Sequence, residues 1–212
     1  SPEGCNLYFT LLLRPECAPD QACMLTLVMA LAVAGAVRQL GLDAGIKWPN
    51  DVVIAGKKVC GILTEMSAEP DFIHYVVIGT GVNVNQETFP EEIAGTATSL
   101  RIEKGERIKR AELLAAVMEH FERAYETFRA SWDLTGLAAE YESLLLNKDR
   151  PVRVLDPKGA FEGTARGINE KGELLVERQD GRRLRICLNR LPSQFCRRLN
   201  CNRRPGGKER EH

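Results

Sequence analysis

The sequence predicts an α+β fold, with a mixed β-sheet flanked by helices and a small C-terminal SH3-like β-barrel. Three observations support this prediction. Strand-like apolar segments and one long apolar helical segment occupy the first 85 residues, and two segments of helical periodicity follow between residues 109 and 146. After residue 150, four short strand-like segments are separated by tight turns, which is typical of a small barrel.

The first 85 residues supply the strands of the predicted sheet. Residues 7–13 (LYFTLLL) form an apolar run, which predicts a strand buried on both faces. Asp20 is expected to cap a helix that runs to about Leu40 and ends at Gly41. Residues 44–47 then lead into the segment KWPND, and strands are expected at 52–54, 58–65 and 74–85, the first two joined by a hairpin at 55–57.

The second half is predicted to contain two helices and the barrel. Residues 89–106 are polar and rich in turn residues, which predicts a mobile loop. The cluster NKDRP is the best domain boundary in the chain. The helices are expected at 109–130 and 134–146, the barrel strands at 152–155, 161–168, 173–177 and 182–186, and the domains at 1–148 and 149–187, with 188–212 as an atypical basic tail.

Composition excludes several classes of protein. Lys plus Arg and Asp plus Glu are 29 each, so the zero net charge gives no sign of contact with nucleic acid. The apolar run 24–37 is too short and too alanine-rich for a membrane span and predicts a buried helix. Seven cysteines without C-x-x-C or His–Cys ligand spacing predict free thiols in a reducing cytoplasm, not a zinc site. The opening SPEGCN shows no initiator Met and no signal peptide, and a strand so close to it predicts a segment lost upstream.

The segment KWPND gathers charged and polar groups ahead of a strand. Pro49 fixes its own φ and restricts Trp48 to an extended conformation, which would hold Asn50 and Asp51 in a rigid turn. Asp51 could accept a backbone N–H in that turn, or ligate Mg²⁺ together with substrate phosphates. For Lys47, a surface position and a contact with the site are both open.

Two strands carry glycines where a packed strand would carry side chains. In GKKVCGILTE, alternation puts Lys58 on one face with Cys60, Ile62 and Thr64, and Gly61 on the other. Such a lysine either extends its head to solvent at the edge or points into a pocket. In VVIGTGVNVN, Gly79, Gly81, Asn83 and Asn85 share one face, which would form a trough with amides at its end; accommodating a neighbouring aromatic ring is the alternative. If these strands are neighbours, Lys58, Asp51 and Asn83 can surround one spot suited to a nucleotide phosphate and an uncharged ring.

In this order and spacing, KWPND, GKKVCGILTE and IGTGVNVN resemble the catalytic domain of biotin protein ligases, as do the opening segment SPEGCNLYFTLLLRP and the small barrel. The resemblance covers roughly residues 1–186 and implies a class II synthetase-like fold. It implies that biotin and ATP, with Mg²⁺, form biotinyl-5′-AMP, and that a lysine of a biotin carboxyl carrier domain, from acetyl-CoA carboxylase or another biotin-dependent carboxylase, accepts the biotinyl group.

The resemblance also implies roles for particular residues. Lys58 would contact the biotin carboxylate and the phosphate as the catalytic cation, while Trp48 and Asn50 would shape the site. The walls and floor of the biotin pocket would be Gly61, Ile62, Leu63, Gly79 and Gly81, and the ATP side would be Asp51, Asn83 and Asn50, with Asp51 as the Mg²⁺ ligand.

Two departures from the family pattern keep alternatives open. A G-R-G-R-x-G-R loop, which folds over the adenylate, would precede Ser1, and any winged-helix segment would also lie upstream. The tail 188–212 lacks strand periodicity and is expected to reflect a frameshift. The alternatives are an impaired fragment that binds only biotin or carrier protein, a relative of lipoate–protein ligases, and a stand-alone interaction module in the barrel. The oligomeric state, a homodimer included, is left open.

Overall fold

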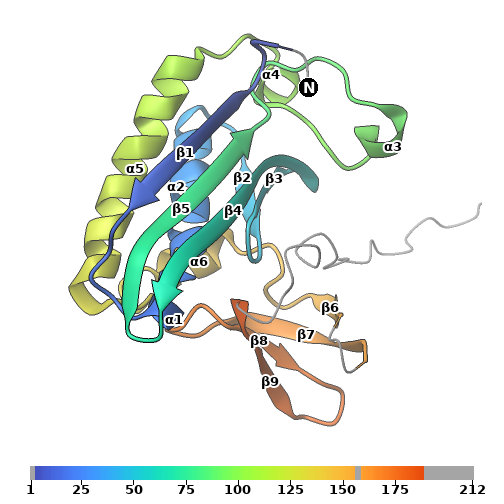
Figure 1. Ribbon diagram of the computed structural model, residues 1–212. Helices are drawn as coiled ribbons and strands as arrows, with labels where there is room; N and C mark the ends of the chain where they lie inside the picture. The colour runs from blue at the N-terminus through green and yellow to red at the C-terminus, as the bar shows by residue number, and fades with distance from the viewer. Residues whose placement is uncertain (1–2, 156–158, 189–212) are drawn as a thin grey trace, which may run out of the picture.

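In the computed structural model, which describes residues 3–155 and 159–188, the chain forms two separate antiparallel sheets (Figure 1). The larger sheet has the strand order β1-β5-β4-β3-β2. The long strands β4 and β5 pair along most of their length, and β1 lies at one edge. The strands are β1 (Leu7–Leu13), β2 (Ala44–Lys47), β3 (Asp51–Ile54), β4 (Lys57–Glu69) and β5 (Phe72–Val82).

The sheet confirms the α+β class but corrects two details of the sequence prediction. All four pairings within it are antiparallel, so the sheet is not mixed. Strand β1 is not buried on both faces, because its residues alternate between half-buried and exposed along its length. The side chains of Tyr8 and Leu12 are 66% and 53% exposed, which shows that the outer face of this edge strand is uncovered.

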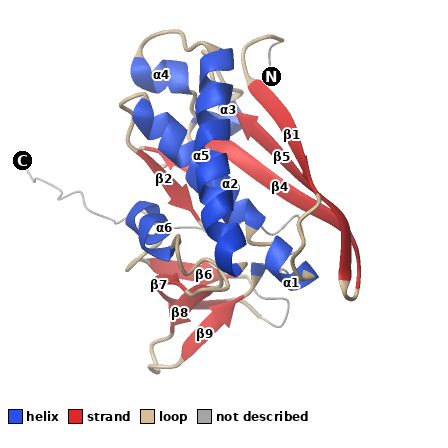
Figure 2. Cartoon of the chain, turned by 90° about the vertical axis from the view of Figure 1, so that its left-hand side faces the viewer, coloured by secondary structure: helices blue, strands red, loops and turns tan. Residues whose placement is uncertain are grey.

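Helices cover one face of the larger sheet (Figure 2). Helix α2 (Leu25–Gln39) packs against α5 (Arg110–Ser131) and against β2, β3 and β4. By length and apolar composition, residues Pro19–Gln39 could cross a membrane, but 72% of that window is buried inside the protein. The argument that the run is too short is therefore wrong, while the prediction of a buried helix is confirmed.

The predicted helix after Asp20 is divided in two. A short helix α1 (Pro19–Ala22) precedes α2, and Ala18 is its N-cap, so Asp20 lies in the first turn instead of capping it. At the other end Gly41 has φ +82° and donates its N–H to the Arg38 carbonyl, as expected of a C-terminal glycine.

The segment predicted as a loop at 89–106 contains α3 (Glu91–Ala94) and α4 (Leu100–Lys104). The Ser99 hydroxyl caps α4 by accepting the Ile102 N–H at 3.2 Å, which is a start signal that turn composition alone obscures. Helix α6 (Ala138–Leu144) is shorter than the predicted helix at 134–146.

The smaller sheet has the order β6-β7-β8-β9. All four strands expected in this part of the chain are present, although closure into an SH3-like barrel and the domain boundaries stay predictions. The tail from residue 189 lies outside the described residues. The strands are β6 (Pro151–Val154), β7 (Phe161–Ile168), β8 (Leu174–Glu177) and β9 (Arg183–Ile186).

Candidate active site

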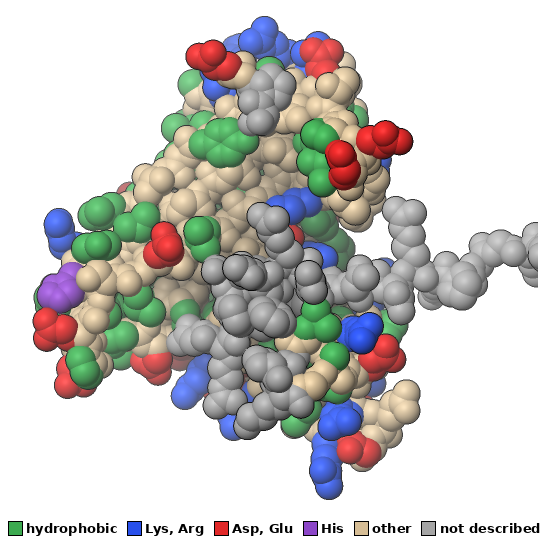
Figure 3. All heavy atoms as spheres, turned by 45° about the vertical axis from the view of Figure 1, so that its right-hand side comes forward, with side chains coloured by type: hydrophobic (Ala, Val, Ile, Leu, Met, Phe, Trp, Pro, Cys, Tyr) green, Lys and Arg blue, Asp and Glu red, His purple; other side chains and the backbone are tan. Residues whose placement is uncertain are grey.

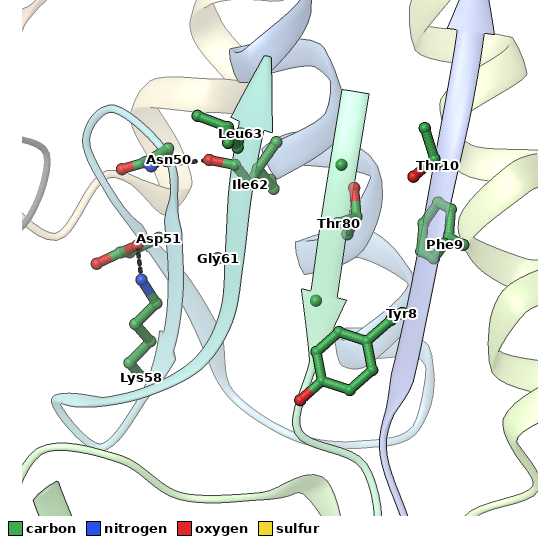
Figure 4. Close-up of a pocket in the computed structure, with 12 residues that line it drawn as sticks. Tyr8, Phe9, Thr10, Asn50, Asp51, Lys58, Gly61, Ile62, Leu63 and Thr80 are labelled. Atoms are coloured by element: carbon green, nitrogen blue, oxygen red, sulfur yellow. Dashed lines mark hydrogen bonds and ion pairs between the residues drawn. The ribbon is translucent and has the colours of Figure 1, made fainter. Parts of the chain in front are cut away.

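The face of the larger sheet that lacks helices is hollowed by a cavity of about 590 Å³. Strands β1, β5 and β4 form its floor, and the turn before β3 forms one wall (Figure 4). In the space-filling view, basic and acidic side chains meet near the middle of this side of the molecule (Figure 3). The cavity is lined by Tyr8, Phe9, Thr10, Asn50, Asp51, Lys58, Gly61, Ile62, Leu63, Gly79, Thr80 and Gly81.

An ion pair between Lys58 and Asp51 lies at the rim of this cavity. The two side chains come from neighbouring strands and point toward each other (Figure 4). The Asp51 side chain is only 11% exposed, whereas that of Lys58 is 43% exposed. The ammonium group is therefore accessible to a ligand, while the carboxylate is held beneath it.

The structure places Lys58 on the opposite face of β4 from the face that strict alternation along the sequence predicts. Cys60 pairs with Val52 and Lys58 pairs with Val53, so Val59 is an extra residue that forms a β-bulge. The bulge shifts the facing of the strand by one residue. Cys60 stays in the core at 1% exposure, and Lys58 joins Gly61 on the cavity side instead of sharing the face of Cys60.

The glycines of β4 and β5 remove side chains from the cavity floor. A Cβ at Gly61 would lie 2.9 Å from the Lys58 Nζ, so a larger residue there would displace the lysine head. A Cβ at Gly79 would meet only the Leu63 carbonyl, at 3.7 Å, which leaves open space above it. At Gly81 the ring of Tyr8 lies 3.1 Å from the Cβ position. Gly81 thus accommodates a neighbouring aromatic ring, which was one of the two explanations for the glycines, while Gly79 forms part of an open trough.

The KWPND turn is held against β4 by a reciprocal pair of hydrogen bonds. The Asn50 Nδ2 donates to the Ile62 carbonyl at 2.8 Å, and the Ile62 N–H donates to the Asn50 carbonyl at 3.1 Å. The Asn50 Oδ1 is buried and accepts no hydrogen bond from the described residues. Trp48 does not line the cavity; its side chain is buried, at 1% exposure.

A second hollow of about 1080 Å³ adjoins the first and shares Tyr8, Asp51, Lys58, Gly61 and Gly81 with it. Lys47 and Asn83 border this second hollow. The Asn83 Nδ2 donates to the Thr98 carbonyl at 3.1 Å. The remaining wall comes from the segment around α3, through Gln86, Thr88, Phe89, Pro90, Ile93, Thr96 and Ala97.

Asn85, predicted to face the trough, has a structural role instead. It is 4% exposed, donates to the Ile108 carbonyl at 2.9 Å and accepts the Ile108 N–H at 2.8 Å. The site also contains residues that sequence reasoning missed, namely Tyr8, Thr10 and the wall around α3. Their signal is weak in one sequence, because Tyr8 and Thr10 look like ordinary members of an apolar strand.

The thiol and carboxylate groups near the hollows limit the chemistry that this site can perform. Burial raises the pKa of the Cys60 thiol to about 12, so this cysteine stays protonated at neutral pH and is no nucleophile. The described residues contain no cluster of three or more His, Cys, Asp or Glu side chains that could hold a metal. Asp51 is the carboxylate that borders both hollows, and Mg²⁺ can take a single carboxylate when water and substrate phosphates complete its coordination.

Comparisons with known proteins agree with this geometry. Residues 1–83 match the family described as Biotin/lipoate A/B protein ligase family, and residues 149–186 match the Biotin protein ligase C terminal domain. The chain is 40% identical over 184 residues to the Bifunctional ligase/repressor BirA of Bacillus spizizenii. That alignment covers 85% of this chain but 56% of the relative, so the chain spans little more than half of its length.

Two further comparisons cover more of each relative. The Biotin–[acetyl-CoA-carboxylase] ligase of Paracoccus denitrificans is 33% identical over 198 residues, which cover 86% of this chain and 78% of that protein. The solved structure of the biotin protein ligase from Aquifex aeolicus in complex with biotin and ATP superposes with a TM-score of 0.75 at 32% identity. It covers 86% of this chain and 75% of the Aquifex chain.

Proposed function

This chain belongs to the biotin protein ligase family, and we propose that it activates biotin with ATP and passes the biotinyl group to a lysine of a carrier protein. The observation that carries the proposal is the exposed Lys58 ammonium group, paired with Asp51, at the junction of two hollows. The glycine-floored hollow would take biotin, and the hollow beside α3 would take the nucleotide. The names of the relatives, and the biotin and ATP of the Aquifex complex, support this choice of ligands.

In the first step a biotin carboxylate oxygen attacks the ATP α-phosphorus. A carbon–oxygen–phosphorus anhydride forms, the bond to the β-phosphate breaks, and pyrophosphate leaves. Two anionic groups must approach each other, and Lys58 lies where its cation can contact both. A fixed cation at this point stabilises the charge that builds up on the phosphoryl oxygens.

Asp51, Asn83 and Lys47 border the nucleotide side of the same junction. Asp51 would hold magnesium, which neutralises phosphate charge when bound, and the unpartnered Asn50 Oδ1 lies on the same turn. Lys47 adds a second cation to this hollow, beyond the one expected from the sequence. These residues bind and orient the triphosphate.

In the second step the uncharged amine of a carrier lysine attacks the anhydride carbonyl carbon. A carbon–nitrogen bond forms, the bond to AMP breaks, and the amine loses a proton to water. The carrier is a biotin carboxyl carrier domain of acetyl-CoA carboxylase or of another biotin-dependent carboxylase. We place the reaction in the cytoplasm, because Cys5, Cys17, Cys23 and Cys60 form no disulfide within the described part of the chain, as expected in a reducing compartment.

Pyrophosphate exchange into ATP that requires biotin tests the first step. In Lys58→Ala we expect exchange to fall by at least about 100-fold, because a charged contact to the reacting groups is lost. The melting temperature should change little, since a pair with a half-exposed lysine adds about 0–1 kcal/mol to stability. Lys57→Ala is the matched control, because Lys57 precedes Lys58 in β4 but borders neither hollow.

Near-normal exchange in Lys58→Ala would remove the lysine from the site. Binding of labelled biotin without any exchange or carrier labelling in the wild-type chain would favour the binding-only alternative. Exchange driven by lipoate in preference to biotin, in a direct competition, would favour the lipoate alternative. The match of residues 149–186 to a biotin protein ligase domain supports biotin over lipoate.

A further inference from the structure

Trp48 makes its polar contact away from the cavities. Its Nε1 donates to the Gly172 carbonyl at 3.0 Å, and Gly172 lies in the turn between β7 and β8 of the smaller sheet. Its backbone N–H donates to the Asn147 Oδ1 at 3.0 Å. The side chain is 1% exposed, so the indole has no access to water in place of Gly172. A buried tryptophan in the motif that carries Asp51 is thus bonded to the other sheet.

The turn that receives this hydrogen bond has little freedom to shift. Gly172 has φ +72°, and a Cβ there would lie 2.5 Å from a Leu27 methyl group of α2. Two residues earlier, the Glu170 carbonyl accepts the Leu134 N–H at 2.8 Å. The Ile168 N–H also donates to the Glu142 carboxylate of α6 at 3.1 Å. The turn and the end of β7 are therefore attached at three points, to Trp48, Leu134 and Glu142. Of these three residues, Trp48 is the closest to Asp51 in sequence.

The other end of the same turn leads to the reacting groups. Asn50 is bonded to Ile62 in both directions, and Asp51 follows it directly at the start of β3. Pro49 lies between Trp48 and Asn50 and restricts the backbone that joins them. Asp51 is thus located by two attachments, one to β4 and one to the smaller sheet.

We propose that Trp48 is a positioning residue that fixes the Asp51 turn through the Gly172 carbonyl, so that the smaller sheet sets the affinity of the site for magnesium–nucleotide. This inference rests on the proposed function. Without the indole N–H, the turn samples other positions, and ordering it consumes part of the binding free energy of the ligand that contacts Asp51. Biotin lies mainly on the glycine floor of β4 and β5, which Trp48 does not touch.

The test compares Trp48→Phe with Trp132→Phe in the 212-residue chain. Trp132, the other tryptophan, packs on Tyr125 and Phe128 at the end of α5 and borders neither hollow. Calorimetry measures the affinity for biotin alone and for a non-hydrolysable Mg–ATP analogue at saturating biotin. For Trp48→Phe we expect about fivefold to tenfold weaker analogue binding, in line with one buried carbonyl left unpaired. Biotin affinity should stay within about twofold, because no contact to the glycine floor changes.

A loss of analogue affinity without an equal loss of biotin affinity identifies Trp48 as a positioning residue. Equal losses of biotin and analogue affinity, or no loss of either in a folded variant, would overturn the inference. If Trp48→Phe does not fold, Glu142→Ala takes its place, since it releases the Ile168 attachment from a partly exposed position. Glu142→Ala should weaken analogue binding and leave biotin affinity nearly unchanged. Equal losses of the two affinities, or no loss of either, would also overturn the inference. A wild-type chain that binds neither ligand would refute the proposed function instead.

Discussion

At the scale of single residues, the ion pair of Lys58 and Asp51 places a cation and a carboxylate together at the junction of the two hollows. Asp51 pairs with the lysine and, in the proposed function, would also offer an oxygen to the nucleotide side. Because the lysine of this pair is half exposed, the pair adds little to folding, and its main effect is to place opposite charges at the junction of the hollows.

Replacing Asp51 with Asn keeps the shape of the side chain and removes its charge. We expect the dependence of nucleotide binding on magnesium to weaken by about tenfold or more, since Mg²⁺ selects carboxylate oxygens. Biotin affinity should change by less than about threefold, because the glycine floor is untouched. Titration of Mg²⁺ at fixed nucleotide measures the first quantity, and calorimetry the second.

Asp43→Asn is the matched control, because Asp43 pairs with Arg38, is 93% exposed and lines neither hollow. Equal losses of magnesium dependence and biotin affinity in Asp51→Asn would contradict the assignment of Asp51 to the nucleotide side.

The sequence was sufficient to bring Lys58, Asp51 and the glycines together, because rigid turn residues and strand glycines are unusual enough to be noticed alone. It did not identify Tyr8, because a tyrosine in an apolar strand is usually core, and its exposure depends on the edge position of β1. The contact of Trp48 with Gly172 was also beyond the sequence, since it joins residues 124 positions apart.

At the scale of elements, β4 and β5 provide a floor made of backbone. Gly79 and Gly81 are two apart on one strand, yet the structure gives them different surroundings. Only the Leu63 carbonyl lies near a Cβ at Gly79, whereas the Tyr8 ring covers Gly81. The two positions should therefore respond differently to the same added methyl group.

Gly79→Ala should fold at least as well as the wild type, because its Cβ meets only ordinary contact distance and alanine loses less backbone entropy. The methyl group would occupy the cavity, so biotin affinity should fall by about tenfold or more through lost contact. Gly81→Ala should instead displace the Tyr8 ring, which is 66% exposed and lies 3.1 Å from the Cβ position.

Thermal unfolding and biotin calorimetry of both variants measure these effects. Gly95→Ala is the control, since no atom of the described residues lies within 4 Å of a Cβ there and Gly95 lines neither hollow. Unchanged biotin affinity in Gly79→Ala would show that biotin does not lie on this floor.

The element boundaries show where sequence rules were sufficient. Hairpins, glycine-terminated helices and the four strands of the smaller sheet follow from local residue types. The bulge at Val59 does not, because it depends on how β4 registers with β3 and inverts the facing of Lys58. The two short helices at 91–94 and 100–104 were also missed, since polar turn-rich segments and short capped helices have similar compositions.

At the scale of the whole molecule, buried thiols make the free energy of unfolding depend on pH in the alkaline range. Burial raises the pKa of Cys60 from 9.0 to about 12, while the unfolded chain keeps the lower value. Between pH 9 and 12 only the unfolded state loses this proton, so the free energy of unfolding falls as pH rises. Cys17 and Cys23, whose pKa values burial raises to about 11, act in the same direction.

Cys60→Ala should flatten this decline by up to about 1.4 kcal/mol per pH unit, although the cavity it leaves lowers stability at every pH. Urea unfolding at several pH values above 9 measures the slope. Parallel slopes for the variant and the wild type would show that Cys60 ionises equally easily in both states.

Because helices α2 and α5 cover only one side of the larger sheet, most of the side chains that pack the interior and most of those that line the cavity lie on opposite faces. Most substitutions above the glycine floor leave the packed interior intact. Selection could therefore alter which acid this scaffold accepts by successive single changes, each in a chain that still folds.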